Sequence, residues 1–356
     1  MIRLGDSPAA RLVVGVDTHK DEHVAVAIDQ LGVRLGEHRL ATNTRGYAGL
    51  ERWAGGLGDV QGFGIEGTGS YGAGLARFLA GHGHAVVEVN RPDRSARRRM
   101  GKSDPTDAES AARAVLARVA HASPKSGVDQ VEMIRMLKTA KNSALKARTQ
   151  AVNQMKALVI TAPAELRQTL EGLTTGTLVT RCAGFRPGDL VTPMGAAKHA
   201  LRSLARRYRH LTSEIKDLES ELGQLILMTA PALVEAFGVG ADTAASLVIT
   251  AGDNPERLKS EAAFAALCGV SPIPASSGKT NRHRLNRGGD RQANAALHRV
   301  VLVRLRYDQR TIGYMRRRIE QGMTKAEVIR CLKRYVAREV FAILRQISQA
   351  NQAKAA

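Results

Sequence analysis

Three short apolar runs follow one another at the start of the chain, and they restrict the fold more than any other feature. The run LVVGVD begins at Leu12, HVAVAID begins at His23, and a third stretch of polar and apolar residues reaches Leu40. Short runs rich in valine and isoleucine, separated by turn residues such as Gly32, are typical of strands. We therefore predict a three-stranded β-meander at the start of the chain.

The region after the meander alternates between helical and strand patterns. Helical segments are predicted from Arg45 and at 71–80, and apolar strands at 63–65 and 85–89. Three strands followed by alternating helices and strands favour a mixed sheet covered by helices. This order is similar to that of the ribonuclease H-like fold, so we expect an α/β domain over residues 1–125.

The middle of the chain, residues 126–228, is predicted to be a helical connector. Residues 131–160 and 197–228 contain few glycines or prolines, and apolar residues recur at steps of three and four from Leu201 to Leu225. Such a seam is typical of an amphipathic core helix or of a coiled coil between subunits. The sequence leaves both interpretations open.

Residues 229–356 are predicted to form a helical C-terminal domain, which makes the fold class of the whole chain α/β plus all-α. Near the start of this domain, two helical segments flank the turn Gly238-Val239-Gly240 and resemble a helix-hairpin-helix. Such a hairpin presents backbone amides and a helix N-terminus to phosphates without reading base sequence. The alternative is a plain helical corner packed in a core.

The charge of the chain restricts its partners. Lys and Arg number 53 against 33 Asp and Glu, a formal net charge of +20, which favours a polyanionic partner such as nucleic acid. Aromatic residues make up 4% of the chain, so binding of duplex or A-form helices through their phosphates is favoured over base stacking. Three cysteines without a C-x-x-C pair, and no apolar span of bilayer length, indicate a cytoplasmic protein without membrane contact.

Four carboxylates stand at the ends of predicted elements. Asp17 ends the first apolar run, Glu66 ends another, and Asp104 and Asp107 lie three residues apart at a predicted helix start. Carboxylates at neighbouring strand ends and on one helix face can converge on divalent cations, and a two-metal site supports phosphodiester chemistry. The strongest alternative concerns Asp104, which could instead be a helix N-cap followed by Pro105.

A second candidate site is the block around Ser276 and Ser277. A serine hydroxyl becomes a nucleophile when a base, a metal or clustered positive charge stabilises its alkoxide. The alternative is a flexible basic loop that contacts phosphates, which composition alone favours. Residues predicted to bind nucleic acid precede Asp104 or follow Ser277, namely Arg94, Arg97, Arg98, Arg99, Lys102, Lys279, Arg282, Arg284, Arg287 and Arg291.

These motifs resemble those of a known family. The stretches VGVDTHKDEHVAVAID, GIEGTGSYG and NRPDRSARRRMGKSDPTDAESAARA are similar to the RuvC-like domain of DEDD transposases of the insertion sequence 110 family. The block AALCGVSPIPASSGKTNRHRLNRGGDRQANAAL is similar to the C-terminal part of the same family, so the resemblance covers nearly the whole chain.

The resemblance implies roles for particular residues. It implies that Mg²⁺ is bound by the four carboxylates Asp17, Glu66, Asp104 and Asp107. It also implies that a serine forms a covalent link with DNA. We assign this serine to Ser277, which precedes Gly278, with Ser276 as the alternate; the family commonly has a second glycine where this chain has Lys279. A bridge RNA guide and a homo-oligomer, dimer or tetramer, are further implications.

We therefore predict a DNA transposase or site-specific recombinase of a bacterial insertion sequence, cytoplasmic and nucleoid-associated, with Mg²⁺ as its cofactor. Two alternatives from other classes remain. An actin-like ATPase or sugar kinase shares the meander and its early aspartate, but the sequence offers no convincing further phosphate and adenosine loops. A non-catalytic nucleic-acid-binding scaffold would have lost the carboxylates, yet all four are present.

Overall fold

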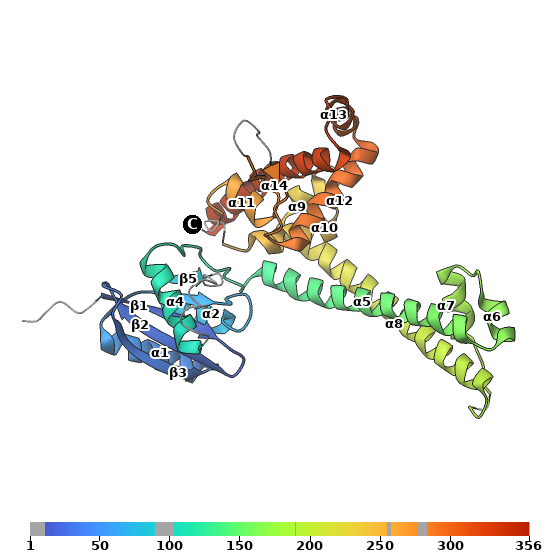
Figure 1. The fold of residues 1–356 in the computed structure, drawn as a ribbon, viewed down its shortest axis with the longest axis horizontal. Coiled ribbons are helices and arrows are strands. Elements are labelled where there is room, and N and C mark those ends of the chain that lie inside the picture. The colour runs from blue at the N-terminus through green and yellow to red at the C-terminus, as the bar shows by residue number, and fades with distance from the viewer. Residues whose placement is uncertain (1–10, 90–102, 189, 255–257, 277–282, 356) are drawn as a thin grey trace, which may run out of the picture. The chain divides into compact units, whose positions relative to one another are not determined.

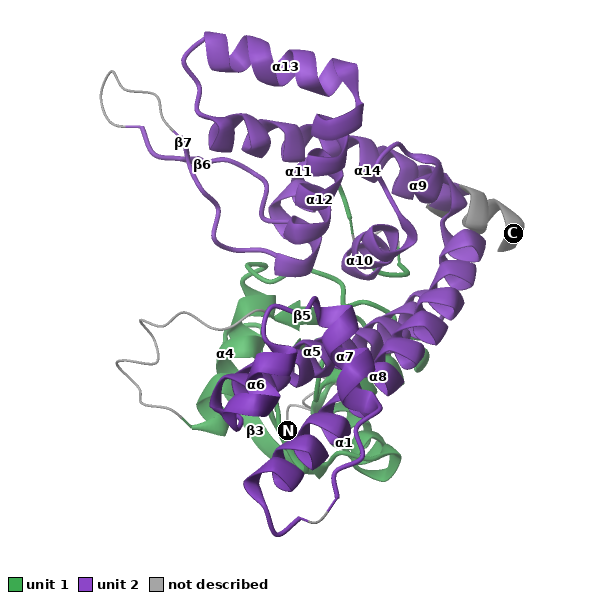
Figure 2. Cartoon of the chain, turned by 90° about the vertical axis from the view of Figure 1, so that its right-hand side faces the viewer, with its two compact units in different colours: residues 1–128, 252–259 green, residues 129–251, 260–356 purple. Residues whose placement is uncertain are grey.

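The computed structural model describes residues 11–89, 103–188, 190–254, 258–276 and 283–355 of the chain. Two compact units are coloured separately in Figure 2. Unit 1 contains residues 1–128 and 252–259, and unit 2 contains residues 129–251 and 260–356. The division into three consecutive domains stays a prediction.

Unit 1 is built on the predicted mixed sheet (Figure 1), in the order β3-β2-β1-β4-β5. The meander is confirmed, because β1 pairs antiparallel with β2, and β2 antiparallel with β3. The remaining strands join in parallel, β4 beside β1 and β5 beside β4. The strands are β1 Arg11–Thr18, β2 Glu22–Asp29, β3 Arg34–Ala41, β4 Asp59–Glu66 and β5 Val86–Val89.

Helices cover both faces of this sheet. Alternate residues of a strand point to opposite faces. Val14 therefore packs with α1 and α2 on one face, whereas its neighbour Val13 packs with α4 on the other. Six consecutive residues of β1 and of β2 are buried, as expected for strands covered on both sides. The helices of unit 1 are α1 Thr44–Leu57, α2 Ala73–Gly81 and α4 Asp104–Leu116.

Two paired glycines allow α4 to lie directly on the sheet. Gly15 of β1 and Gly64 of β4 are partners in the parallel ladder. A Cβ atom at Gly15 would lie 1.9 Å from the carbonyl oxygen of Ala108 and 2.3 Å from the amide nitrogen of Ala112. Only glycine permits so close an approach of helix and strand backbones. This contact fixes the first turn of α4 relative to the end of β1.

We expect Gly15→Ala to destabilise unit 1 by about 3 kcal/mol or more, because the added methyl group must displace the α4 backbone. The matched control is Gly55→Ala in α1, where a Cβ meets nothing within 4 Å. That variant should be neutral, or more stable by up to about 1 kcal/mol. Urea denaturation followed by circular dichroism measures both. Equal unfolding midpoints for the two variants would contradict the close approach.

Unit 1 also contains a later piece of the chain, residues 252–259, which we call the return segment. The carboxylate of Asp253 accepts hydrogen bonds from the backbone N–H groups of Ser126 at 3.0 Å and Gly127 at 2.9 Å. Beside it, Asn254 Nδ2 donates to the carbonyl oxygen of Pro124 at 2.7 Å. Burial tends to raise the pKa of Asp253, but these hydrogen bonds hold it below its ordinary value. Residues 253 and 254 are therefore bonded to residues 124–127, near the end of the first stretch of unit 1.

Unit 2 contains two long helices that lie side by side (Figure 1), α5 Gln130–Thr161 and α8 Pro193–Thr229. At one end they enclose a small core with α6 Ala164–Leu170 and α7 Thr175–Ala183, in which Met155, Leu178 and Leu201 are buried. Leu201 and Leu222 of the predicted apolar seam are thus buried within a single chain. The interpretation of the seam as an amphipathic core helix accounts for this burial.

The C-terminal part of unit 2 contains α10, a helix in which eight of eleven residues are buried. In the predicted turn before it, Gly238 has a φ of 83°. In the described part of the chain, no helix is both long and apolar enough to cross a membrane. The elements of this part are α9 Pro231–Glu235, α10 Ala241–Ala251, α11 Glu261–Leu267, β6 Ile273–Pro274, β7 His283–Arg284, α12 Arg291–Tyr307, α13 Gln309–Glu320 and α14 Lys325–Ala355.

A buried ion-pair network connects α5 to α10. Lys138 and Lys141 are 6% and 4% exposed, and both donate hydrogen bonds to Oδ1 of Asp242. Burial tends to raise the pKa of Asp242, but the bonds from the two lysines hold it below its ordinary value. The start of α10 is therefore anchored by charges inside the protein.

Candidate functional site

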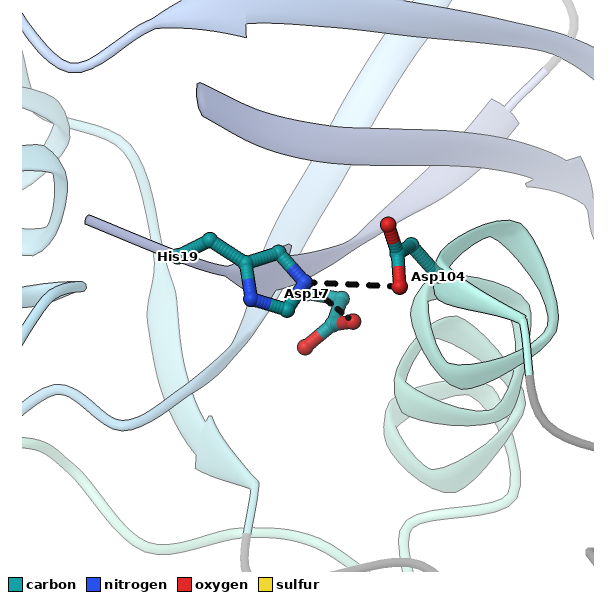
Figure 3. Close-up of side chains that lie close together, drawn as sticks. All are labelled: Asp17, His19 and Asp104. Atoms are coloured by element: carbon teal, nitrogen blue, oxygen red, sulfur yellow. Dashed lines mark ion pairs between the residues drawn. The ribbon is translucent and has the colours of Figure 1, made fainter. Parts of the chain in front are cut away.

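Three side chains with potential ligand atoms meet at the end of β1, as Figure 3 shows. Asp17 lies near the end of β1, His19 follows that strand, and Asp104 is the first residue of α4. His19 Nε2 lies 3.2 Å from Asp17 Oδ2 and 3.5 Å from Asp104 Oδ1. One ligand atom from each residue falls within 4.8 Å of the others. The arrangement can hold a cation between two carboxylates.

The local sequence explains why these groups converge. Gly15 and Asp17 are two residues apart in β1, so the strand directs both to the face covered by α4, and His19 follows two residues after Asp17, just beyond the strand. The close approach at Gly15 brings the first turn of α4 to this point. His19 was missed by the sequence analysis, although its spacing of two from Asp17 is a signal that could have found it.

The carboxyl group of Asp17 is buried beside two other aspartates. Burial raises the pKa of this carboxyl group, the neighbouring His19 lowers it, and the charges of Asp107 and Asp104 raise it further. The net result is a pKa above the ordinary value for aspartate. A group whose ionised form is disfavoured by burial and by like charges gains from a nearby cation. The electrostatics of the site therefore favour binding of a positive ion.

The capping alternative for Asp104 is wrong. Ser103 is the N-cap of α4, and its hydroxyl accepts a hydrogen bond from the backbone N–H of Thr106 at 3.4 Å. Asp104 is instead the first helical residue, and Pro105 follows it. A hydroxyl at the N-cap satisfies one of the unpaired amides of the first turn. The carboxylate of Asp104 therefore has no capping role and faces His19.

The other two predicted carboxylates lie near this group. Asp107 lies in the first turn of α4 and is 2% exposed, and its charge acts on Asp17. Glu66 ends β4, the parallel neighbour of β1, and Thr18 Oγ1 donates a 2.9 Å hydrogen bond to its carbonyl oxygen. Among the described residues, the 4.8 Å group contains neither Asp107 nor Glu66.

The glycine-rich stretch after Glu66 forms a tight strand-to-helix turn. Gly67 has a φ of 64°, and its carbonyl oxygen accepts hydrogen bonds from the N–H groups of Ser70 and Gly72. A Cβ atom at Gly72 would lie 2.8 Å from the carbonyl oxygen of Glu66. The glycines therefore hold the backbone of Glu66 at the end of its strand.

The serine block forms a hairpin in unit 2. Ser276 follows β6 and is exposed, and β6 pairs antiparallel with β7. Ser277 and the residues that follow it through 282 lie outside the described residues. At the base, a Cβ atom on Gly289 would lie 2.5 Å from the backbone nitrogen of Gly269. Two glycines, both with positive φ, thus bring the two ends of the block into backbone contact.

The predicted nucleic-acid-binding residues are only partly described. Three of these arginines are exposed in β7 or in the residues that follow it, namely Arg284, Arg287 and Arg291. The others lie outside the described residues, namely Arg94, Arg97, Arg98, Arg99, Lys102, Lys279 and Arg282.

Comparison with known proteins gives matches over both units. Residues 14–162 match a family model for DEDD transposases of the IS110 type, described as "Transposase". Residues 230–316 match a second model, described as "Transposase IS116/IS110/IS902 family". The chain is also similar to the "Insertion element IS110 uncharacterized 43.6 kDa protein" of Streptomyces coelicolor, with 28% identity over 159 residues. That match covers 44% of this chain and 39% of the relative.

Proposed function

Because the chain belongs to the IS110 family of transposases, we propose that it cuts and rejoins DNA as the transposase of an insertion sequence, acting as a site-specific recombinase. The convergence of Asp17, His19 and Asp104, within the region matched by the first family model, is the observation that carries this proposal. The sheet order and its helices on both faces support a RuvC-like, ribonuclease H-like domain. Family membership speaks against the ATPase or kinase alternative.

Asp17, Glu66, Asp104 and Asp107 would hold Mg²⁺. Carboxylate oxygens are the ligands that this cation takes, and the raised pKa of Asp17 fits a site that needs positive charge. Bound Mg²⁺ supplies Lewis acidity to the attacking and leaving oxygens of a phosphodiester. Imidazole nitrogen suits Mg²⁺ poorly, so His19 would act by holding Asp17 and Asp104 in place.

The serine block would supply the nucleophile, with Ser277 favoured and Ser276 as the alternate. The serine Oγ forms a bond to phosphorus, the bond from phosphorus to a deoxyribose oxygen breaks, and the serine proton passes to that leaving oxygen. The resulting phosphoserine diester conserves the bond for rejoining. The exposed guanidinium groups of Arg284 and Arg287 support this assignment, since they can hold the phosphates beside the serine.

The partners proposed for this enzyme are DNA, a bridge RNA and further copies of the chain. A helix-hairpin-helix at α9 and α10 would contact the DNA backbone without reading its sequence. Its support is the positive φ of Gly238 and the exposure of Gly240 directly before α10. Strand exchange requires several DNA strands to be held together, which favours a dimer or a tetramer.

The proposed function is tested by purifying the protein from cells that carry its DNA element and sequencing the bound RNA. We expect one dominant RNA with segments complementary to donor and target DNA. With that RNA, labelled duplexes should be cut and joined in Mg²⁺, and chelation by EDTA should abolish the reaction. Hydrolysis of ATP without DNA would instead favour the kinase-like alternative. DNA binding without cleavage in Mg²⁺ would favour a non-catalytic scaffold.

A further inference from the structure

A cleft of about 650 Å³ lies between α14 and the hairpin that β6 and β7 form in the serine block. The hairpin side is lined by residues such as Pro272, Arg284 and Leu285, and the helix side by residues such as Arg330 and Lys333. Its volume is in the range of pockets that hold small ligands, about 300 to 1,000 Å³. The residues that line the cleft belong to unit 2, whereas the carboxylate group belongs to unit 1.

Lys333 is a buried cation in the wall of this cleft. The residue is 8% exposed, and its ammonium group donates a 2.9 Å hydrogen bond to Oδ1 of Asn294. The Asn294 amide nitrogen in turn donates to the carbonyl oxygens of Cys268 and Gly269, at the base of the serine block. Among the described residues, no carboxylate lies within ion-pair distance of Lys333. A buried ammonium with only neutral contacts is costly to fold.

The charges that surround Lys333 do not compensate for it. Arg330 pairs with Glu327 at 3.7 Å, and Glu327 also accepts hydrogen bonds from Thr324 at the start of α14. Burial lowers the pKa of Lys333, and the charge of Arg330 lowers it further. The arginine on the hairpin side of the cleft, Arg284, has no carboxylate partner among the described residues. The cleft therefore carries excess positive charge.

We propose that this cleft binds one backbone phosphate of the DNA substrate, held by Lys333 and Arg284. A phosphate is the anion that the proposed substrate offers, and it would give Lys333 the counter-charge that the described protein lacks. Bound there, the phosphate lies against the hairpin that carries Ser276, so it positions the DNA strand relative to the serines. This inference rests on the proposed function for the identity of the substrate.

The test uses Lys333→Gln in the full-length protein. Glutamine removes the charge and keeps an amide hydrogen-bond donor, on a side chain that is one bond shorter than that of lysine. The matched control is Lys325→Gln, which removes an exposed lysine from the same helix without touching the cleft. We expect Lys333→Gln to weaken duplex DNA binding about tenfold and to reduce the slope of log K against log salt by about 0.9, the contribution of one phosphate. Lys325→Gln should change affinity by less than about threefold.

Thermal unfolding separates a binding role from a structural one. A lysine needed only for packing would lower the unfolding midpoint when it is replaced. Removal of a buried cation without an acidic partner should leave the midpoint unchanged or raise it. Titration with inorganic phosphate should raise the midpoint of the wild type and of Lys325→Gln, but not that of Lys333→Gln.

The outcomes distinguish this inference from the proposed function. Unchanged DNA affinity and salt slope in Lys333→Gln, in a protein that cuts DNA, overturn the phosphate site alone. Weakened binding to RNA with unchanged binding to DNA overturns the assignment to the DNA strand. If the wild type neither binds nor cuts DNA, the proposed function fails, and the phosphate titration still decides whether the cleft is an anion site.

Discussion

Asp17→Asn is expected to abolish strand cleavage, with a loss of rate of about 1,000-fold or more. The substitution keeps the shape of the side chain and removes a ligand charge from the proposed metal site. Stabilisation of transition-state charge by a metal amounts to several kcal/mol, and about 4 kcal/mol corresponds to 1,000-fold in rate. DNA affinity should stay within about threefold of the wild type, because the chain keeps its 53 cationic residues. Denaturing gels and fluorescence anisotropy measure these quantities.

The control for this prediction is Asp21→Asn, which changes an exposed acid between β1 and β2, outside the group of Asp17, His19 and Asp104. That variant should cut DNA at the wild-type rate. Asp17→Asn should also unfold at the same temperature or higher, since burial disfavours the ionised carboxylate that it removes. Cleavage by Asp17→Asn at the rate of the control would overturn the assignment of Asp17 to the site.

Because Ser103 caps α4, the effect of Asp104→Asn is attributed to the site. The Asp104→Asn variant should keep the stability of α4, whereas its rate of DNA cleavage should fall.

Ser277→Ala is expected to eliminate the covalent protein–DNA adduct while binding to nucleic acid persists. In a serine mechanism the adduct survives denaturation, whereas a reaction with water as the nucleophile leaves no protein attached. Only the proposed nucleophile is removed in this variant, and the exposed Arg284 and Arg287 remain available to phosphates. Denaturing electrophoresis of reactions with end-labelled DNA, followed by peptide mapping of the adduct, measures the result.

Ser276→Ala serves as the neighbouring control and should retain the adduct. An adduct that maps to Ser276 would shift the nucleophile by one residue. Normal recombination by both variants would eliminate the serine mechanism and leave the carboxylates to act alone.

The sheet of unit 1 could be predicted because its signal is local. The runs LVVGVD and HVAVAID consist of short apolar segments bounded by turns, and the structure pairs them as β1 and β2. The position of α4 could not be derived in the same way. In the sequence, Gly15 looks like an ordinary residue of a strand. The need for glycine at this position comes from a helix that begins about 90 residues later. A close approach of two backbones leaves no periodic pattern in either segment.

The chemistry of the site was predictable only in part. Asp17 and Asp104 were found because each stands at an element end, whereas His19 required attention to the strand period beyond the last apolar residue. The burial of Lys138 and of Lys333 was not predicted. On an amphipathic helix a lysine suggests a solvated face, and only the packing of a second helix shows that it is buried.

The hydrogen bonds of Asp253 and Asn254 with residues 124–127 limit how the gene of this protein can recombine with the genes of its relatives. Unit 1 is completed by residues 252–259, which are encoded far downstream of its sheet, so a single crossover between two genes cannot transfer the unit whole. A chimera joined after residue 128 would combine the backbone of Ser126 and Gly127 with a return segment from another lineage. The part of the chain before residue 129 and the return segment at 252–259 should therefore be inherited together, and their sequences should change in step.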